Sequence, residues 1–429
     1  MKTLKLTFFC FAFLFAGISA VIADDLCVSP GGGGGCYSTI TEAIAAASDG
    51  DRIIIEPQAG EVPYAENLEI NNSLEFLSDV AETQFVIQGD ITITPAAGRI
   101  VTFIGMKNNE GDLTATGNSP AGDRCQVNIM DCHFVNGSIG LNYNYFDVNI
   151  VSCVFDDGSI LIRHGNIIGN DITTVNNAGY YGSPFWAYTA IQIRNDAVAT
   201  EDTMLIAGNK ITIDQNYPTQ TRIGILTYYP GQYIQIENNL FRTNLSSGST
   251  NVDYAVYLYF NKAGDGHNTI ASNTVDFTVY DKLKIGFYIT NTYAGSNTEV
   301  KNNLILSNNG VGIQGSGNSG PVSLSYNFMS SPLTIVDLVD NGTNNLTSNS
   351  TVNAEGVLQG GSDAIDAGAP GYDYYDLDLT RNDVGAYGGS FTLDNFFPMT
   401  GAARVFMVFA PRAATLGNTI KVNAESFDR

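Results

Sequence analysis

The sequence has few charged residues and almost no long helical pattern. Charged residues make up 15% of its 429 positions, histidine occurs 3 times and tryptophan once. It contains no Cys-x-x-Cys pair, no glycine-rich loop followed by a helix and a lysine, and no serine-nucleophile motif. These absences argue against a zinc or redox site, nucleotide binding and serine-based hydrolysis. Beyond the first residues, no apolar run is long enough to span a membrane.

Glycine, in contrast, is abundant at 45 residues, and aromatic residues reach 11%. That mixture favours many short strands joined by tight turns over a helical fold. The formal net charge of −23 repels nucleic acid and anionic lipid, so we expect neither nucleic-acid binding nor membrane insertion. The simplest interpretation of this charge is solubility in an extracellular medium.

Residues 1–23 are predicted to be a signal peptide. Lys2 and Lys5 precede an apolar run over 6–15, and cleavage is expected after Ala23. A membrane anchor is the alternative, but the run is too short to span a bilayer and two aspartates follow it. We therefore expect bacterial-type export, with the mature chain secreted or held at the cell surface.

Export permits disulfide bonds. Cys27 and Cys36 flank five consecutive glycines, and because such a loop is flexible we expect these two cysteines to be bridged. Cys132 and Cys153 are expected to lie one above the other, either bridged or as packed thiols, and the pairing of Cys125 stays open.

An internal repeat dominates the chain. Residues 127–139 match 148–160 at an offset of 21, and the shared pattern recurs downstream. Coils of about 20 residues that stack on one another produce such a repeat, with inward apolar residues forming a continuous core. An Asn at each bend tolerates the left-handed conformation and bonds its neighbours as a ladder. The predicted ladder positions are Cys132, Cys153, Asn170, Asn209, Asn239, Asn273, Asn303 and Asn327.

A second recurring strand, at 190–193, 224–226, 255–258, 286–289 and 312–314, follows the longest insertions. The long loops are therefore expected to leave the stack at one corner. The fold predicted over 24–395 is all-β, a right-handed parallel β-helix.

Both ends of the stack carry their own signals. Thr39 and Glu42 form a capping box that opens a helix, and this helix is expected to cover the first coil. Segments 363–368 and 382–389 are expected to close the last coils. Residues 396–429 are expected to form a short β-hairpin tail that caps the far end, or that joins neighbouring molecules by strand addition.

The chain resembles exported bacterial right-handed parallel β-helix repeat proteins with the pectate-lyase-like architecture. The likeness lies in 37–44 with 50–54, in the asparagine-ladder repeats, and in 363–368 with 381–387, and it spans most of 27–390. These parts are specific for fold and poor guides to activity, because the group includes lyases, hydrolases, epimerases and adhesins.

The resemblance implies that the strand after the long loops forms the floor of a cleft. Alternation along that strand predicts two outward columns that are polar and rich in tyrosine. Tyrosine rings stack on sugars and their hydroxyls bond to sugar hydroxyls, although tyrosine also simply suits an exposed strand. The loop that holds Trp186 is either a further sugar platform or a self-packed loop. The predicted substrate-binding residues are Gln192, Tyr228, Tyr257, Tyr259, Tyr288 and Trp186.

The resemblance also raises a lyase hypothesis, because pectate lyases use an arginine as base. Arg163 and Arg194 fall in neighbouring rungs of one column, with His164 beside them, and these three are the catalytic candidates. The competing interpretation, which the acidic composition favours, is that both arginines pair with local acids. The two columns contain no Asp or Glu, which argues against a glycosidase.

Asp376, Asp378 and Asn382 alternate oxygen ligands as calcium loops do. An ordinary acidic turn explains the same residues better, so Ca²⁺ is an optional ligand and no cofactor is expected to be required.

Three functions remain in order of preference. The first is binding of a polysaccharide or cell-surface glycan along the tyrosine-rich face. The second is a calcium-dependent lyase acting on a uronate polymer. The third is a structural or filament-forming surface protein that self-associates through its C-terminal strands.

Overall fold

The computed structural model describes residues 23–428 with internal gaps. For the short strands 179–181, 403–409 and 423–428 the backbone alone is described. The gaps are 176–178, 182–186, 197–199, 201, 215–220, 244–251, 260–265, 280–283, 291–296, 318–319, 331–333, 339–343, 372–374, 377, 390, 398, 400–402 and 410–422. The predicted signal peptide and Trp186 therefore lie outside the described residues.

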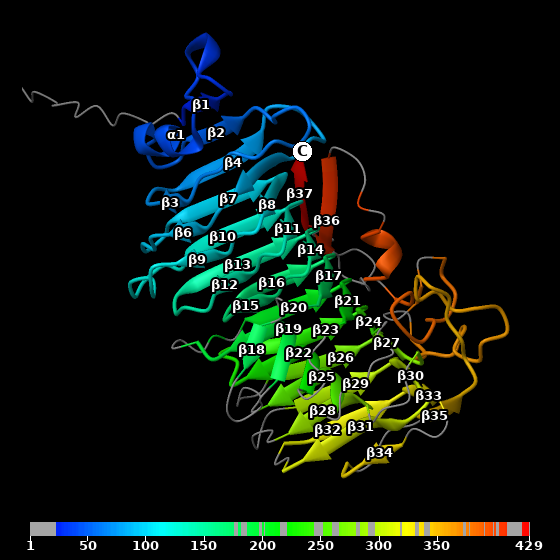
Figure 1. Cartoon of the computed structure of the whole chain (residues 1–429). Coiled ribbons are helices and arrows are strands. Elements are labelled where there is room, and N and C mark those ends of the chain that lie inside the picture. Colours follow the sequence, from blue (N-terminus) through cyan, green and yellow to red (C-terminus); the bar gives the residue numbers. More distant parts are fainter. Residues whose placement is uncertain are drawn as a thin grey trace, which may run out of the picture.

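In the described residues, three long parallel sheets of 12, 11 and 11 strands run along the molecule (Figure 1), and the third also carries one short antiparallel strand. Sheet A contains β1 (Asp25–Val28), β2 (Arg52–Ile55), β4 (Leu74–Ser78), β7 (Ile100–Ile104), β10 (Cys125–Met130), β13 (Phe146–Val151), β16 (Gly165–Ile168), β20 (Thr203–Ala207), β23 (Tyr233–Glu237), β26 (His267–Ala271), β29 (Asn297–Lys301) and β32 (Val322–Ser325). Sheet B contains β5 (Phe85–Gln88), β8 (Met106–Asn109), β11 (His133–Val135), β14 (Val154–Asp156), β17 (Asp171–Thr174), β21 (Lys210–Ile213), β24 (Leu240–Arg242), β27 (Thr274–Phe277), β30 (Leu304–Ser307), β33 (Phe328–Ser330) and β35 (Leu346–Ser348).

Sheet C contains β3 (Leu68–Ile70), β6 (Ile91–Ile93), β9 (Leu113–Ala115), β12 (Ile139–Leu141), β15 (Ile160–Ile162), β19 (Ala187–Arg194), β22 (Thr221–Tyr228), β25 (Asp253–Tyr259), β28 (Lys284–Thr290), β31 (Gly310–Ser316) and β34 (Ile335–Val336). A short strand, β18 (Gly179–Tyr181), pairs antiparallel with β19.

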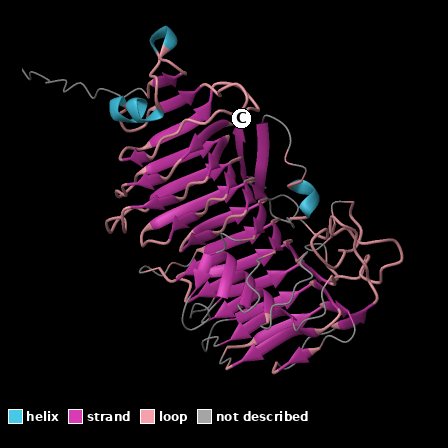
Figure 2. Cartoon of the chain, in the orientation of Figure 1, coloured by secondary structure: helices cyan, strands magenta, loops and turns pink. Residues whose placement is uncertain are grey.

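Each coil visits the sheets in the order A, B, C and then returns to A one rung further on. Strand makes up nearly all of the regular structure, and helix appears only as short pieces at the ends of the described chain (Figure 2). The predicted all-β, right-handed parallel β-helix is thereby confirmed.

Alternation along the strands builds the core. In β13, for example, Phe146, Val148 and Ile150 are fully buried while Asp147 and Asn149 face outward. Identical positions on successive rungs stack, as the parallel rings of Phe134 and Phe155 show with centroids 5.0 Å apart. One hydrophobic cluster therefore runs continuously from the first coils to the last.

The bend from sheet A to sheet B holds the predicted ladder. Each Asn amide donates to the side-chain oxygen of the next, as Asn239 Nδ2 does to Asn273 Oδ1 at 3.0 Å, and the ladder continues one step further, to Asn345. We expected the ladder Asn itself to adopt the left-handed conformation, and this was wrong. The residue before each ladder position adopts it: Asp131, Ser152, Gly169, Gly208, Asn238, Ser272, Asn302, Tyr326 and Asn344.

Two of the cysteines described are joined by a disulfide bond and three are free. Cys27 and Cys36 form a disulfide with Cα atoms 4.8 Å apart, which confirms that prediction. Cys125, Cys132 and Cys153 are free and buried, so the stacked pair is packed thiols rather than a bridge.

A helix, α1 (Ile40–Ala46), lies at the first coils, where the capping box predicted one. Thr39 Oγ1 accepts from the Glu42 N–H at 3.1 Å, and Glu42 bonds Ser38 in return. Its residues Ile40, Ala43 and Ile44 belong to the main core. That it protects the open edge of the stack remains a prediction. No helix in the described parts of the chain is both long and apolar enough to cross a membrane.

The C-terminal part of the chain does not stop at the last coil. The described residues between 363 and 399, here called the return segment, run back along the bend between sheets A and B. Gly385 N bonds Asn302 O, Ala386 N bonds Thr274 Oγ1 and Asn238 Nδ2 bonds Ala386 O. A short 3-10 turn, η3 (Leu393–Asn395), follows.

Further along, Phe396 covers the left-handed glycines at 169 and 208, where any Cβ would meet its ring at 2.6 and 2.2 Å. Met399 then borders the same hollow as Cys132 and Ser152. After it come β36 (Ala403–Phe409) and β37 (Asn423–Asp428), which pair antiparallel. Figure 1 shows both strands away from the last coils, β33 to β35. The expected position of the tail, as a cap on those coils, is therefore wrong.

Candidate functional site

The outer face of sheet C carries the two predicted columns in the predicted register. Gln192, Leu226, Tyr257, Tyr288 and Gln314 pair rung by rung. So do Arg194, Tyr228, Tyr259, Thr290 and Ser316. The inward neighbours of these residues, such as Ile191, Ile225, Val256 and Phe287, are in the main core. Because parallel rungs repeat at ~4.8 Å, each column places like side chains within stacking distance.

Six tyrosines from β22, β25 and β28, one of them (Tyr229) just past the end of β22, form one connected group, here called the tyrosine cluster. Ring centroids lie 4.7 Å apart for Tyr257 and Tyr288, and 5.4 Å apart for the stacked pair Tyr228 and Tyr259. Tyr254 joins the first pair at 5.0 Å from Tyr257, and Tyr229 joins the second at 4.8 Å from Tyr228. All six are half-buried, so each keeps part of its ring accessible.

Partial burial also affects two of these hydroxyls. It raises the pKa of Tyr254 to about 12, and it raises the pKa of Tyr257 further, in both cases assisted by neighbouring tyrosine hydroxyls. The hydroxyls of Tyr254 and Tyr257 therefore stay protonated at neutral pH and can donate hydrogen bonds as well as accept them.

Gln192 is less accessible than the alternation pattern suggested. It points out of the sheet, but only 1% of its surface is exposed. Leu226, the next residue of its column, is fully buried in a separate apolar cluster with Ala187 and Ile223. The outer face is thus covered at these two rungs and half-open at the tyrosine cluster.

The three catalytic candidates are only partly brought together. Arg163 and Arg194 occupy neighbouring rungs, and Arg163 donates to Asn142 Oδ1 at 3.1 Å and to Asn144 Oδ1 at 2.8 Å. Burial lowers the pKa of the Arg163 guanidinium; Asp196 opposes this shift and Arg194 adds to it.

His164 faces a different sheet. Its Nδ1 lies 3.0 Å from Asp147 Oδ1 on β13, and its Nε2 lies 3.9 Å from Asp202 Oδ2. The imidazole is therefore engaged with carboxylates near sheet A rather than with the sheet C column. Asp196, the carboxylate that acts on the pKa of Arg163, forms an ion pair with Arg124 at 2.5 Å.

A line of buried charges on sheet C was not anticipated from the sequence. Arg222, Asp253 and Lys284 are in register on successive rungs, and each is at most 2% exposed. Arg222 Nε donates to Asp253 Oδ1 at 2.8 Å, while the Lys284 ammonium lies 4.9 Å from the ring centre of Phe277. Burial lowers the pKa of Lys284 to about 8, against the attraction of Asp253.

Two of the calcium candidates, Asp376 and Asp378, accept hydrogen bonds from other residues of the return segment. Asp376 accepts backbone N–H groups from Gly389 at 2.6 Å and from Asp383 at 2.9 Å, and Asp378 accepts from Thr380. Burial raises the pKa of Asp376 to about 6. The side-chain oxygen of Asn382 is buried and bonds no partner. Within the described residues no three His, Cys, Asp or Glu side chains cluster as metal ligands would.

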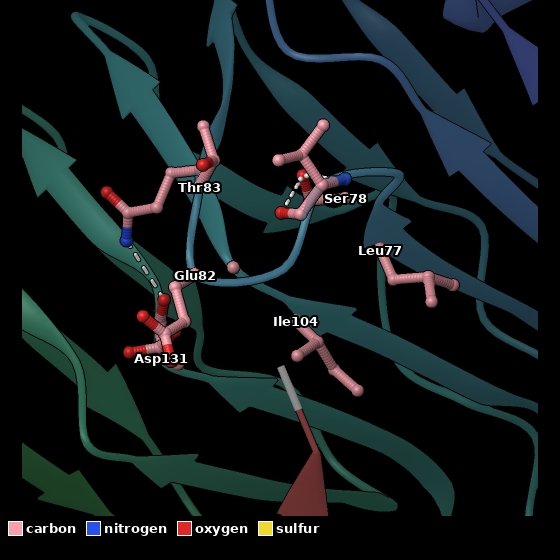
Figure 3. Close-up of a pocket in the computed structure, with 9 residues that line it drawn as sticks. Leu77, Ser78, Glu82, Thr83, Ile104 and Asp131 are labelled. Carbon is pink, nitrogen blue, oxygen red and sulfur yellow. Dashed lines mark hydrogen bonds between the residues drawn. The ribbon is translucent and has the colours of Figure 1, made fainter. Parts of the chain in front are cut away.

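Two hollows lie over the first coils, away from sheet C. The larger, of about 680 Å³, is bordered by 57–61 and 82–84 and includes Lys107, His133 and Met399. Lys107 is paired with Glu61 at 2.6 Å and His133 with Asp156 at 2.7 Å, so both of these side chains already have partners. Figure 3 shows the smaller hollow, about 10 Å³, between Leu77, Ile104 and Asp131.

Comparison with known proteins adds little beyond the architecture. A family model described as a protein of unknown function, DUF1565, matches residues 154–324. No curated protein matches the chain. The crystal structure of pectate lyase Pel9A is similar with a TM-score of 0.33 and 13% identity, over 86% of this chain and 96% of that chain. The fold is established by the three stacked sheets themselves.

Proposed function

We propose that this protein acts outside the cytoplasm and binds a polysaccharide or cell-surface glycan along the outer face of sheet C. The tyrosine cluster is the observation that carries the proposal. Its rings succeed one another rung by rung and are half-buried, and the hydroxyls of Tyr254 and Tyr257 remain protonated. A hydroxyl-rich chain that runs along the stack would meet an aromatic face and a hydrogen-bonding group at each step.

The extracellular setting has separate support. The Cys27–Cys36 disulfide forms and persists in oxidising compartments, and a leader of the export type is predicted ahead of it. The absence of Asp and Glu from both columns favours binding over glycosidase chemistry.

The lyase alternative is less well supported. A base must be free to take a proton from the substrate, whereas Arg163 already donates to the oxygens of Asn142 and Asn144. The depressed pKa of Arg163 is the one feature that favours it.

Affinity electrophoresis and calorimetry with soluble polysaccharides test the proposal. The panel comprises polygalacturonate, alginate, xylan, laminarin and soluble chitin oligosaccharides. Tyr257→Ala and Tyr259→Ala should each weaken binding about tenfold, which corresponds to about 1.4 kcal/mol of lost stacking.

Tyr387→Ala is the matched control, because Tyr387 is also half-buried but lies on the return segment. Equal loss in all three variants, or no binding to any member of the panel, contradicts the proposal. Unsaturated product that appears with calcium and disappears in Arg163→Ala would establish the lyase instead.

A further inference from the structure

Arg163 carries a charge that no acid in the described residues pairs with. Its Nε donates to the backbone and side-chain oxygens of Asn142, both at 3.1 Å, and its Nη1 donates to Asn144 Oδ1 at 2.8 Å and to the backbone oxygen of Asn195. These acceptors are all neutral. Ion pairs in the described part of the chain involve other cations, although the sequence holds 43 acids against 20 lysines and arginines.

The same bonds fix the direction of the guanidinium and leave one of its ends open. Within the described residues Nη2 makes no hydrogen bond, and it is not buried, so its two N–H groups meet solvent. The side chain as a whole is half-buried, and this burial lowers the pKa of the guanidinium because the charge has lost part of its hydration. An anion bound at Nη2 would offset that cost without disturbing the bonds that position Arg163.

A second guanidinium stands beside the first, in the column that carries the tyrosines. Arg194 lies on the next rung, is half-buried, and is followed in register by Tyr228 of the tyrosine cluster. The two arginines repel each other, because Arg194 contributes to the lowered pKa of Arg163. The acid between them and solvent is already engaged: Asp196 pairs with Arg124, and its side chain is only 1% exposed. The column thus continues from aromatic rings into two neighbouring cations.

We infer that Arg163 and Arg194 bind a sulfate ester of a sulfated polysaccharide, an assignment that rests on the proposed glycan-binding function. A chain that lies on the tyrosine cluster meets Arg194 and then Arg163 at successive steps of ~4.8 Å. A sulfate ester keeps its charge at all ordinary pH values and has three free oxygens, so each guanidinium can donate to an oxygen of its own.

Other sugar substituents fit this pair of arginines less well. A neutral sugar leaves both charges without a partner. A carboxylate presents two oxygens in one plane, which the fork of a single arginine already fills. The net charge of −23 also repels polyanions at long range, so a bound polyanion needs direct contacts of this kind.

The test compares three soluble polymers of one backbone: cellulose sulfate, carboxymethylcellulose and hydroxyethylcellulose. Calorimetry at about 0.15 M salt should show cellulose sulfate binding about tenfold or more tightly than the other two. Arg163→Gln and Arg194→Gln should each remove most of that advantage and leave the affinity for hydroxyethylcellulose unchanged. Circular dichroism checks folding, and Arg194→Gln keeps the test decisive if the loss of the bonds to Asn142 and Asn144 unfolds the other variant.

Arg52→Gln is the matched control. It removes one positive charge from an exposed ion pair with Asp25 on the first coils, so it changes the long-range field equally and touches neither arginine of the column. The preference for cellulose sulfate should survive this change.

The outcomes that overturn the inference differ from those that overturn the wider proposal. Equal affinity for cellulose sulfate and carboxymethylcellulose, or a sulfate preference that persists in both arginine variants, removes the sulfate site. If hydroxyethylcellulose binds best and Tyr257→Ala weakens it, the glycan-binding face stands without an anion site. No binding of any of the three polymers, in the intact protein and in every variant, removes the sulfate site as well, and the wider panel then decides the glycan-binding face.

Discussion

Replacing Asn239 by Ala is the sharpest test of the ladder. Asn239 is fully buried in the middle of the stack. Its Oδ1 accepts from Asn209 N at 3.0 Å and from Asn209 Nδ2 at 2.8 Å. Its own Nδ2 donates to Ile206 O at 2.8 Å and to Asn273 Oδ1 at 3.0 Å.

The size of the effect follows from which groups are left without partners. Asn209 Nδ2 still reaches Ile167 O, and Asn273 Oδ1 still accepts from the backbone N–H of residue 239. The backbone N–H of Asn209 loses its acceptor, which costs about 1–3 kcal/mol for a buried donor. The small cavity adds to this, so we expect a loss on the order of 3 kcal/mol.

Urea denaturation followed by circular dichroism measures this loss, with Asn345→Ala as the matched control. Asn345 ends the ladder and is half-exposed, so water can replace its bonds to Asn327 and Leu324. Its removal should cost about 1 kcal/mol or less. If the two variants differ by less than about 0.5 kcal/mol, the interior of the ladder contributes no more than its end and the reasoning fails.

Two further predictions concern charge and packing. Because Lys284 has a pKa of about 8 in the fold and 10.5 as its ordinary value, the unfolded chain holds this proton more tightly, and stability should rise as the pH goes from about 8 towards 10. Lys284→Met should remove that rise in urea midpoints measured across the interval, and an unchanged slope would show that Lys284 is not the titrating group. Phe396→Ala should cost about 3–5 kcal/mol, because its ring is buried over Gly169 and Gly208. Gly208→Ala should be less harmful in the Phe396→Ala background than alone, and additive losses would show that ring and glycine do not interact.

The repeat made the stack and its register predictable, because every rung places an apolar residue, a bend and a strand at recurring positions. The left-handed position was missed by one residue since its occupants, such as Asp131, Ser152, Gly169 and Asn238, share no common side chain. Periodicity reports what repeats, and these residues are set by backbone geometry alone.

The sequence predicted which side chains point out of sheet C, but not which of them are buried by other parts of the chain. Alternation correctly placed Gln192 and Tyr257 on the outer face, but it does not tell whether a residue distant in sequence covers them. Arg222, Asp253 and Lys284 occupy the same place on successive strands, so comparing strand starts could have brought the buried charges together. The return segment has no period. The prediction that 363–368 and 382–389 close the last coils agrees with the bond of Asp363 to Ser348, but Ala386 bonds Thr274 and Asn238 on earlier coils.

The return segment changes how the stack should come apart. In a simple repeat array each rung touches only its neighbours, so unfolding can begin at an end and spread rung by rung. Here one stretch of chain bonds Asn302, Thr274 and Asn238 and then covers the glycine bends at 169 and 208. When the return segment detaches, rungs that do not contact one another directly all lose the same partner. The coils from 169 to 302 should therefore exchange their amide hydrogens as one cooperative block, rather than fraying progressively from the C-terminal end.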